Sequence, residues 1–484
     1  DDVSAYDALR VVYRRQLVQI AALDVTDVPA NVLPATAASL ADLAGAALEA
    51  GLHIATQSVE GAEQARLAVI GMGKTGGREL NYISDVDVIF VAEPADGGDE
   101  DVALRLATEL ATELMRACSA STGEGSLWQV DAALRPEGKQ GPLVRTVASH
   151  RNYYERWAKG WEFQALLKAR PIAGDREVGE AYIAAMRPMV WQASKRENFV
   201  EDAQAMRRRV ESHVPVSEQA RQIKLGPGGL RDIEFSVQLL QLVHGRTDER
   251  VRARSTLDAL EALSSWGYVG RTDASALDRS YRQLRVLEHR IQLSKMRRTH
   301  LMPTSSADLR RLGRGVGLMR DPDEAVTAHW QELARSVRRL HEKLFYRPLL
   351  SSVARVPGEQ LALGPKAAGE WLRALGFADP DGALRCAERG PERAQPVGRG
   401  GIGAFRRRQD APAVDEQLGE AGIRTGVLGA GDRMRGDEMH AFRQMRRHVL
   451  DDGALHRADV GDDGAGLQMR GNLGRDRRAG HCCS

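Results

Sequence analysis

The pattern of apolar and polar positions predicts a helical segment at the start of the chain. Apolar residues recur near helical spacing from Tyr6 to Leu23, and residues 38–52 are rich in Ala and Leu, which favour helices. The pattern changes near Arg66. The runs Leu67–Ile70 and Val86–Val91 are rich in β-branched residues and are bounded by Gly and polar clusters, which is typical of strands.

The next part of the chain mixes predicted helices and strands, and the part after it is helical throughout. We expect a helix at Asp101–Ala117 and a third strand at Leu127–Leu134. These elements predict a helical lead-in at residues 1–60, an α+β domain at residues 61–175 and a helical bundle at residues 176–350. The clearest apolar stripes of that bundle consist of Tyr281, Leu284, Leu287 and Ile291, and of Val326, Trp330, Leu333, Val337, Leu340 and Leu344.

The last hundred residues depart from this pattern. Residues 351–385 still read as the start of a further helical segment, but residues 386–484 contain no Lys, Tyr or Trp and are rich in Gly and Arg. So few large apolar residues cannot build a core. We expect residues 386–484 to be disordered, either as native sequence or because a GC-rich gene is translated out of frame from near Arg385 or Cys386.

Composition and charge exclude several classes of protein. The chain has 484 residues, enough for roughly two to four domains. Its 68 basic and 66 acidic residues give a formal net charge of +2, which favours neither nucleic acid nor a membrane surface as partner. Long apolar runs and a signal-peptide pattern are missing, and the chain begins with Asp1, so we expect a fragment without a signal peptide. Four scattered cysteines favour a reduced, cytoplasmic protein.

A Gly-rich segment, Gly-Met-Gly-Lys-Thr-Gly-Gly at 71–77, follows the first predicted strand and allows three interpretations. As a dinucleotide fingerprint it would need a crossover helix, for which Lys74–Ser84 is too short. As a P-loop it would need Gly in place of Ala68, and an apolar run that ends in Asp, whereas Asp87 precedes its run. Both interpretations are therefore disfavoured.

The third interpretation depends on aspartates that follow the loop. Asp85 and Asp87 stand at i and i+2, so on a strand they share one face, about 7 Å apart. Alone, such a pair is more often found at a turn. Asp131 ends the apolar-polar run Leu127–Val130 of another predicted strand, and if the two strands are neighbours, three carboxylates converge where two Mg²⁺ ions could be held. This arrangement predicts a polymerase-beta-like nucleotidyltransferase palm.

Four ordered blocks make the interpretation more specific. They are Gly71–Phe90, Val130–Leu143, Tyr153–Arg170 and Lys224–Gln238. In sequence and spacing they resemble the bifunctional glutamine synthetase adenylyltransferase/adenylyl-removing family, and the resemblance runs from about residue 1 to 384. That family carries two nucleotidyltransferase halves. One attaches AMP from ATP to a tyrosine of glutamine synthetase, and the other removes it by phosphorolysis, which releases ADP.

The resemblance implies one such half and its residues. Glu79–Tyr82, Gly229–Arg231 and the region of Leu287 and Glu288 look like the N-terminal, adenylyl-removing half. By the resemblance, the catalytic metal ligands are Asp85, Asp87 and Asp131. Nucleotide or phosphate contacts fall on Gly71, Gly73, Lys74, Gly76, Ser84 and Arg135. Expected partners are glutamine synthetase, ATP or ADP, phosphate and a PII-type signalling protein.

Several residues have a plain structural interpretation beside the functional one. Lys74 could face solvent instead of phosphate, and Arg135 could form a salt bridge. Lys168 and Arg170 are similar cases. For Asp232 and Glu234 we expect partnership with a helix dipole, for His244 a place at a helix end, and for Arg297, Arg298, Arg338 and Arg339 a solvated surface.

Three other functions remain open. The chain could be the adenylyl-adding half of the same family. It could carry a palm that modifies another protein, as in regulatory uridylylation. It could also be a fragment that binds glutamine synthetase without catalysis. Metal-dependent turnover of nucleotide separates the enzymes from the binding fragment.

Overall fold

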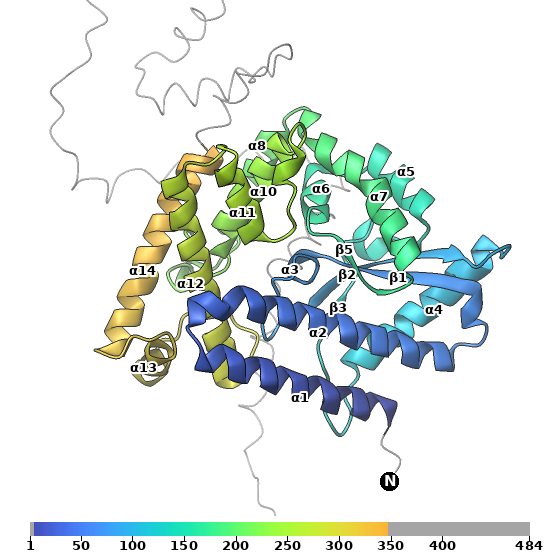
Figure 1. The fold of residues 1–484 in the computed structure, drawn as a ribbon, viewed down its shortest axis with the longest axis horizontal. Helices are drawn as coiled ribbons and strands as arrows, with labels where there is room; N and C mark the ends of the chain where they lie inside the picture. Colours follow the sequence, from blue (N-terminus) through green and yellow to red (C-terminus); the bar gives the residue numbers. More distant parts are fainter. Residues whose placement is uncertain (1–3, 347–484) are drawn as a thin grey trace, which may run out of the picture. The chain divides into compact units, whose positions relative to one another are not determined.

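A computed structural model of the chain describes residues 4–346, in which helices surround one small sheet (Figure 1). The prediction of a further helical segment at residues 351–385 lies outside the described residues. So does the prediction of a disordered or out-of-frame segment at residues 386–484.

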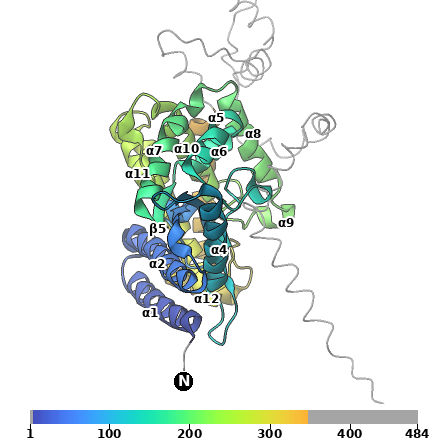
Figure 2. The same ribbon diagram turned by 90° about the vertical axis from the view of Figure 1, so that its right-hand side faces the viewer.

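The first two helices confirm the predicted helical start. α1 (Ala5–Thr26) begins at Ser4, whose Oγ accepts a hydrogen bond from the Asp7 backbone N–H at 3.1 Å. α2 (Pro29–Ser58) is rich in Ala and packs against α1, so the two lie side by side in both views (Figure 1, Figure 2). α2 also packs against the last strand of the sheet and therefore covers one of its faces.

The sheet is small and mixed. It consists of β1 (Ala65–Gly71), β2 (Val86–Pro94), β3 (Val130–Asp131), β4 (Val144–Arg145) and β5 (Arg170–Gly174). The strand order is β3-β2-β1-β5, and β4 also pairs with β2. β1 is antiparallel to β2 and β5, whereas β3 and β4 are parallel to β2.

The antiparallel pairing of β1 and β2 removes the two disfavoured interpretations of the Gly-rich segment. A dinucleotide or P-loop fold joins parallel strands through a crossover helix. Here the connection contains α3 (Gly73–Gly76), a single helical turn, and the chain then returns beside β1. The strands predicted at Leu67–Ile70 and Val86–Val91 are confirmed.

The third predicted strand is much shorter than expected. We predicted Leu127–Leu134, but only Val130 and Asp131 form β3. The reason is that β3 pairs only with the first two residues of β2, Val86 and Asp87, while β2 is paired further along with β4.

α4 (Glu100–Ser119) confirms the helix predicted at Asp101–Ala117 and packs on the sheet. Asp99 caps it by accepting a hydrogen bond from the Val102 backbone N–H at 2.9 Å. Its apolar face packs with α2 and with the central strands in one core. The buried residues of that core include Leu40, Leu48, Val69, Val88, Phe90, Leu110 and Leu114.

Helices dominate the chain beyond β4, and no strand lies within residues 176–346. They are α5 (Val147–Arg156), α6 (Gly160–Leu166), α7 (Arg176–Gln192), α8 (Phe199–Ser212), α9 (Val216–Gln219), α10 (Leu230–His244), α11 (Thr256–Ser265), α12 (Arg271–Lys295), α13 (Ser306–Gly315) and α14 (Pro322–His341). The two predicted apolar stripes lie on α12 and on α14 with the residues after it, and both are buried in a second core.

The described chain is therefore α+β and mostly helical, as expected. None of its helices, over residues 4–346, is long and apolar enough to cross a membrane. The domain boundaries at residues 60, 175 and 350 stay predictions. α12 packs against α2, α11 and α14, so the helical region contacts the part of the chain that holds the sheet.

Candidate active site

The Gly-rich loop lies directly against one of the predicted catalytic aspartates. The backbone N–H of Met72 donates to the Asp87 backbone oxygen at 2.8 Å, which holds the loop at the start of β2. Gly73 has φ +51°, a left-handed conformation that favours glycine. A Cβ at Gly73 would stand 2.6 Å from Oδ2 of Asp87, so a side chain here would displace the carboxylate.

Gly76 closes the other side of the loop. A Cβ at this position would stand 2.1 Å from the Lys168 carbonyl oxygen and 2.3 Å from that of Gly71. Only a residue without a side chain lets these three backbone segments approach so closely. Gly73 and Gly76 are therefore required by packing, and contact of the predicted glycines with a phosphate stays a prediction.

Two of the three predicted catalytic aspartates are neighbours across the sheet. Asp87 on β2 is in register with Asp131 on β3, as the hypothesis of adjacent strands required. Oδ1 of Asp131 also accepts a hydrogen bond from the Ala133 backbone N–H at 2.7 Å. Asp85 directly precedes β2 and is half-buried. Since Asp85 and Asp87 are two residues apart at the strand, the three carboxylates belong to one end of the sheet.

Asp85 has a cationic partner that the sequence analysis missed. Nη1 of Arg298, beyond the end of α12, donates to Oδ1 of Asp85 at 2.5 Å. Burial, opposed by Arg298 but reinforced by the charges of Asp87 and Asp131, raises the pKa of Asp85. The prediction that Arg298 belongs to a solvated surface was wrong, because the chain after α12 turns back toward the sheet. Arg297 and Arg339 are exposed, as predicted, and Arg338 is half-buried and pairs with Glu211 on α8.

The carboxylates offer the chemistry of a Mg²⁺ site but are not arranged as a closed one. Within residues 4–346, no group of three His, Cys, Asp or Glu side chains is placed to hold a metal ion. Asp85 is instead engaged by Arg298. Carboxylate oxygens are the ligands that Mg²⁺ prefers, and Asp87 and Asp131 repel the charge of Asp85, which a cation would offset. The residues fit the ion chemically, and Mg²⁺ binding stays a prediction.

Lys74 points into the protein, and the alternative of a solvent-facing lysine is excluded. Its Nζ lies 3.0 Å from Oε2 of Glu288 on α12 and 3.3 Å from Oδ1 of Asn81. Burial, together with the charge of Arg285 and against the attraction of Glu288, lowers the pKa of Lys74 to about 7. A phosphate contact of Lys74 would have to compete with Glu288.

Glu288 belongs to a buried charged cluster on α12 that joins the helical region to the Gly-rich loop. Besides Lys74, it pairs with Arg285 at 3.2 Å and lies 3.0 Å from Nδ1 of His300. Burial would raise the pKa of Glu288, but Lys74 and Arg285 lower it well below its usual range. A sequence signal existed, since polar residues follow the apolar stripe of α12 at helical spacing: Arg285, Glu288, His289 and Gln292.

The remaining predicted phosphate contacts are engaged locally. Arg135 donates to the carbonyl oxygens of Ala132, Gly141 and Pro142 at 2.9 to 3.1 Å, and thus holds the loop that follows β3. Its expected salt bridge is replaced by these backbone contacts. Ser84 is half-buried beside Asp85. A nucleotide contact of Arg135 or Ser84 stays a prediction.

Residues of the later blocks support the loop from behind. Lys168 is buried and pairs with Glu79, which also accepts hydrogen bonds from Thr256 N–H at 2.7 Å and from the Tyr281 hydroxyl at 3.2 Å. Arg170 donates to the backbone oxygens of Thr75 and Gly76.

The acids of the Lys224–Gln238 block have structural partners. Asp232 is buried and pairs with Arg207, and it accepts a hydrogen bond from the Gly228 backbone N–H at 2.7 Å. Glu234 pairs with Arg231 at 3.1 Å. His244 ends α10, as expected, and stacks on Tyr268.

Comparison with known proteins identifies relatives. Residues 1–185 match the family described as glutamate-ammonia ligase adenylyltransferase, and residues 204–345 match the family described as GlnD PII-uridylyltransferase. The chain is 60% identical over 382 residues to the bifunctional glutamine synthetase adenylyltransferase/adenylyl-removing enzyme of Streptomyces avermitilis. It is 61% identical over 384 residues to that of Streptomyces coelicolor, and 48% identical over 411 residues to that of Bifidobacterium longum.

These matches cover most of the chain but less than half of each relative. The alignments span 78% to 80% of this chain and 38% of each of the three relatives. Since the relatives are bifunctional enzymes by name, a chain of this span matches only part of what they contain.

Proposed function

We propose, because this chain belongs to the glutamate-ammonia ligase adenylyltransferase family, that residues 61–175 form a polymerase-beta-like nucleotidyltransferase palm acting on glutamine synthetase. The reaction we propose is removal of AMP from an adenylylated tyrosine by phosphorolysis. The observation that carries the proposal is the register of Asp87 with Asp131 beside Gly73, with Asp85 two residues before Asp87. A metal-dependent phosphoryl transfer needs carboxylates such as these close together in space.

The chemistry demands alignment and charge more than a general base. An oxygen of orthophosphate attacks the phosphorus of the adenylyl group, and the bond from that phosphorus to the tyrosine oxygen breaks. The products are ADP and tyrosinate, which takes a proton from water. The phenol has an ordinary pKa of about 10, so stabilising its developing charge lowers the barrier. Backbone N–H groups of the Gly-rich loop are suited to approach the phosphate oxygens.

Asp85, Asp87 and Asp131 are the residues that would hold Mg²⁺. When bound, Mg²⁺ would supply the positive charge that aligns the phosphates and offsets the charge of the leaving oxygen. In this state Asp85 would exchange the guanidinium of Arg298 for a metal ion, or share both. Either arrangement relieves the repulsion among the three carboxylates.

The same proposal includes the partners and the place of action. ATP or ADP and phosphate would be the small substrates and products, in the cytoplasm. The match of residues 204–345 to a PII-uridylyltransferase family supports a PII-type protein as regulator. The second candidate is the adenylyl-adding reaction, which the bifunctional names of the relatives keep open.

The test uses the whole chain with AMP-modified glutamine synthetase, Mg²⁺ and phosphate, and follows release of ADP. The inactive variant carries Asp85→Asn and Asp87→Asn. The matched control carries Asp96→Asn and Asp101→Asn, which remove the same charge from exposed positions after β2. Circular dichroism checks that all three chains are folded.

Each outcome decides between the candidates. Phosphate-dependent ADP release by the wild type and the control, but not by the inactive variant, supports adenylyl removal. AMP transfer from ATP to unmodified glutamine synthetase without ADP release would replace it with the adenylyl-adding reaction. A folded wild type that is silent in both assays would overturn both, in favour of a binding fragment.

A further inference from the structure

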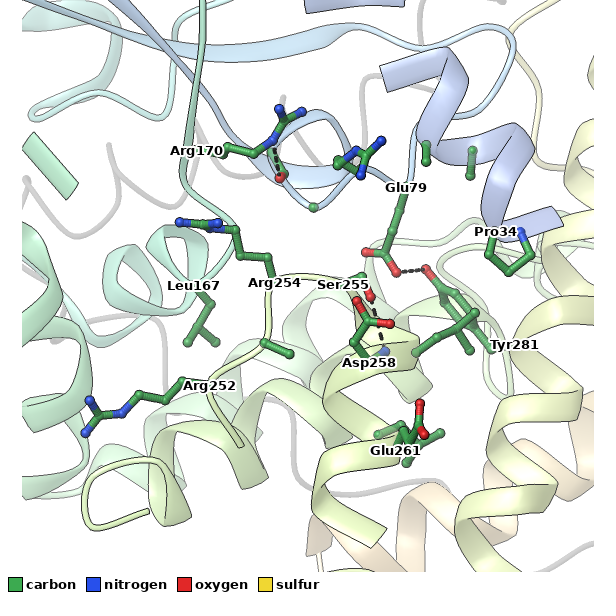
Figure 3. Close-up of a pocket in the computed structure, with 18 of the residues that line it drawn as sticks. Pro34, Glu79, Leu167, Arg170, Arg252, Arg254, Ser255, Asp258, Glu261 and Tyr281 are labelled. Carbon is green, nitrogen blue, oxygen red and sulfur yellow. Dashed lines mark hydrogen bonds between the residues drawn. The ribbon is translucent and has the colours of Figure 1, made fainter. Parts of the chain in front are cut away.

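A cavity of about 800 Å³ lies against the end of the Gly-rich loop, where Gly76 and Gly77 line it. Its walls come from the start of α2, from α7, α11 and α12, and from the segment Gly76–Glu79 (Figure 3). Asp85, Asp87 and Asp131 do not line it. Its volume lies in the range of sites for small molecules, about 300–1,000 Å³. Its lining is therefore distinct from the aspartates of the candidate active site.

Three guanidinium groups from separate segments gather in this cavity. They belong to Arg78 after the loop, Arg170 at the start of β5 and Arg254 before α11. Burial, and the like charges of Arg78 and Arg254, lower the pKa of Arg170, while Asp42 opposes them. Figure 3 shows Arg170 and Arg254 at one end of the cavity, with Glu261 toward the other.

The charge of this arginine group is not balanced. Asp42 on α2 pairs with Arg78 and lies 3.9 Å from Arg170, so the two arginines share one carboxylate. Arg254 and Arg170 otherwise donate hydrogen bonds to neutral backbone oxygens, those of Ala169, Thr75 and Gly76. Three positive charges and one negative charge leave an excess of two, which a phosphate monoester dianion would neutralise.

The rest of the cavity suits the body of an organic molecule. Apolar side chains line it from three helices, among them Leu33, Met186, Val190 and Leu257. A cavity that combines an apolar wall with guanidinium groups at one end is typical of a site for an amphipathic anion. Arginine forks also bind phosphate with paired hydrogen bonds, which gives the charged end a defined orientation.

We propose that this cavity binds a small organic phosphate, with the phosphate group held by Arg78, Arg170 and Arg254 and the organic body against the apolar wall. Arg170 connects the ligand to the Gly-rich loop, because it donates to the backbone oxygens of Thr75 and Gly76. A ligand that draws Arg170 toward its phosphate weakens these bonds. The site is thus positioned to adjust the loop whose other side faces Asp87.

Binding is tested by calorimetry on the whole chain, with phenyl phosphate as the probe. EDTA is present throughout, so that metal-dependent binding at the aspartates does not contribute. Benzoate carries the same ring with one negative charge, and benzyl alcohol carries no charge. Phenyl phosphate is expected to bind at least about tenfold more tightly than benzoate, and benzyl alcohol much more weakly. Because no turnover is measured, the outcome does not depend on the proposed catalytic activity.

Two variants locate the site. Arg254→Gln removes an exposed guanidinium that donates a hydrogen bond to the backbone oxygen of Ala169, and it should weaken phenyl phosphate binding about tenfold or more. Arg335→Gln removes the same charge from an exposed position on α14, outside the cavity, and should leave binding unchanged. Thermal unfolding checks that both variants fold.

The proposal is overturned by any of three results. These are no binding of phenyl phosphate by the wild type at millimolar concentration, equal binding by Arg254→Gln and wild type, and benzoate binding as tightly as phenyl phosphate. The last result would assign the cavity to carboxylates instead.

Discussion

Arg298 and Asp85 are 213 residues apart in the chain, and the Arg298 Nη1 lies 2.5 Å from Oδ1 of Asp85. The arginine follows α12 in the helical region, and the aspartate directly precedes β2. A residue of the helical region therefore contacts one of the three aspartates that we propose as the catalytic centre. Through this contact the helical region contributes a residue to the candidate active site.

Replacing Arg298 should change the ionisation of Asp85. Arg298 opposes the increase in the Asp85 pKa that burial causes, so Arg298→Gln should raise that pKa further. Carboxyl NMR without metal measures it directly. If catalysis needs ionised Asp85, the acidic limb of the pH–rate profile moves to higher pH. Arg297→Gln, at the exposed neighbouring position, is the control and should leave the Asp85 pKa unchanged. An unaltered pKa in Arg298→Gln would contradict the pairing.

Gly73 should be needed for activity more than for stability. In Gly73→Ala the new Cβ must displace the Asp87 carboxylate, from which it would stand 2.6 Å. We expect a loss of activity of about a hundredfold, as for a catalytic group moved by 1 Å. Because φ is positive at this position, the alanine should also lower the free energy of unfolding by about 1 kcal/mol.

Gly97→Ala supplies the matched control for that prediction. Gly97 also has a positive φ, +73°, but a Cβ there would meet nothing within 4 Å. Both variants should therefore lose similar stability in denaturant unfolding, and only Gly73→Ala should lose activity. Equal activity of the two variants would show that the loop does not position Asp87.

Removing the charge of Glu288 from its buried ion pair with Lys74 should lower the free energy of unfolding. Glu288→Gln leaves the nearly buried Lys74 without its carboxylate partner, which costs about 3–5 kcal/mol when a buried pair is broken. Adding Lys74→Met should recover part of this loss, because the buried amine without a partner is removed. Urea unfolding measures both free energies.

An exposed glutamate tests whether the effect depends on burial. Glu332→Gln on α14 makes the same chemical change at an exposed position and should alter stability by less than about 0.5 kcal/mol. If the double variant were no more stable than Glu288→Gln, the contribution of Lys74 to the loss would be refuted. Arg285 and His300, the other partners of Glu288, would then account for it.

His150 should make stability depend on pH in the acid range. It is buried against Tyr182, and burial, reinforced by Arg145, lowers the pKa of His150 to about 3. Between about pH 6.5 and 3 the unfolded state binds a proton that the folded state does not. The free energy of unfolding therefore falls as pH falls through this window, by at most about 1.4 kcal/mol per pH unit for this one group.

His150→Phe removes that titration and keeps the ring. Its unfolding free energy, measured by denaturant at several pH values, should depend less steeply on pH than that of the wild type. The slope does not vanish, because His289 and His300 are also buried with lowered pKa values, of about 4 and 3. His53→Phe, at an exposed position on α2, should keep the wild-type slope. Identical slopes in the wild type and His150→Phe would refute the assignment.

The sequence by itself determined where several helices and two strands lie, and the order of the glycines and aspartates along the chain. Apolar periodicity located α1, α12 and α14, an Ala- and Leu-rich composition located α2, and the short β-rich runs located β1 and β2, with the helix α4 expected after them. These signals are local, since each depends on residues a few positions apart that share one face of a helix or strand. The spacing of Asp85 and Asp87, and the glycines before them, is local in the same sense.

Only the tertiary structure decided the partners of the charged side chains. Arg298 meets Asp85, Glu288 meets Lys74, and three arginines from separate segments gather behind the loop, although nothing in their local patterns requires it. The short length of β3 was decided in the same way, by the partner strand β2. Contacts between segments far apart in the chain depend on how packed helices and strands are placed, and long charged side chains adapt to that placement after the cores form.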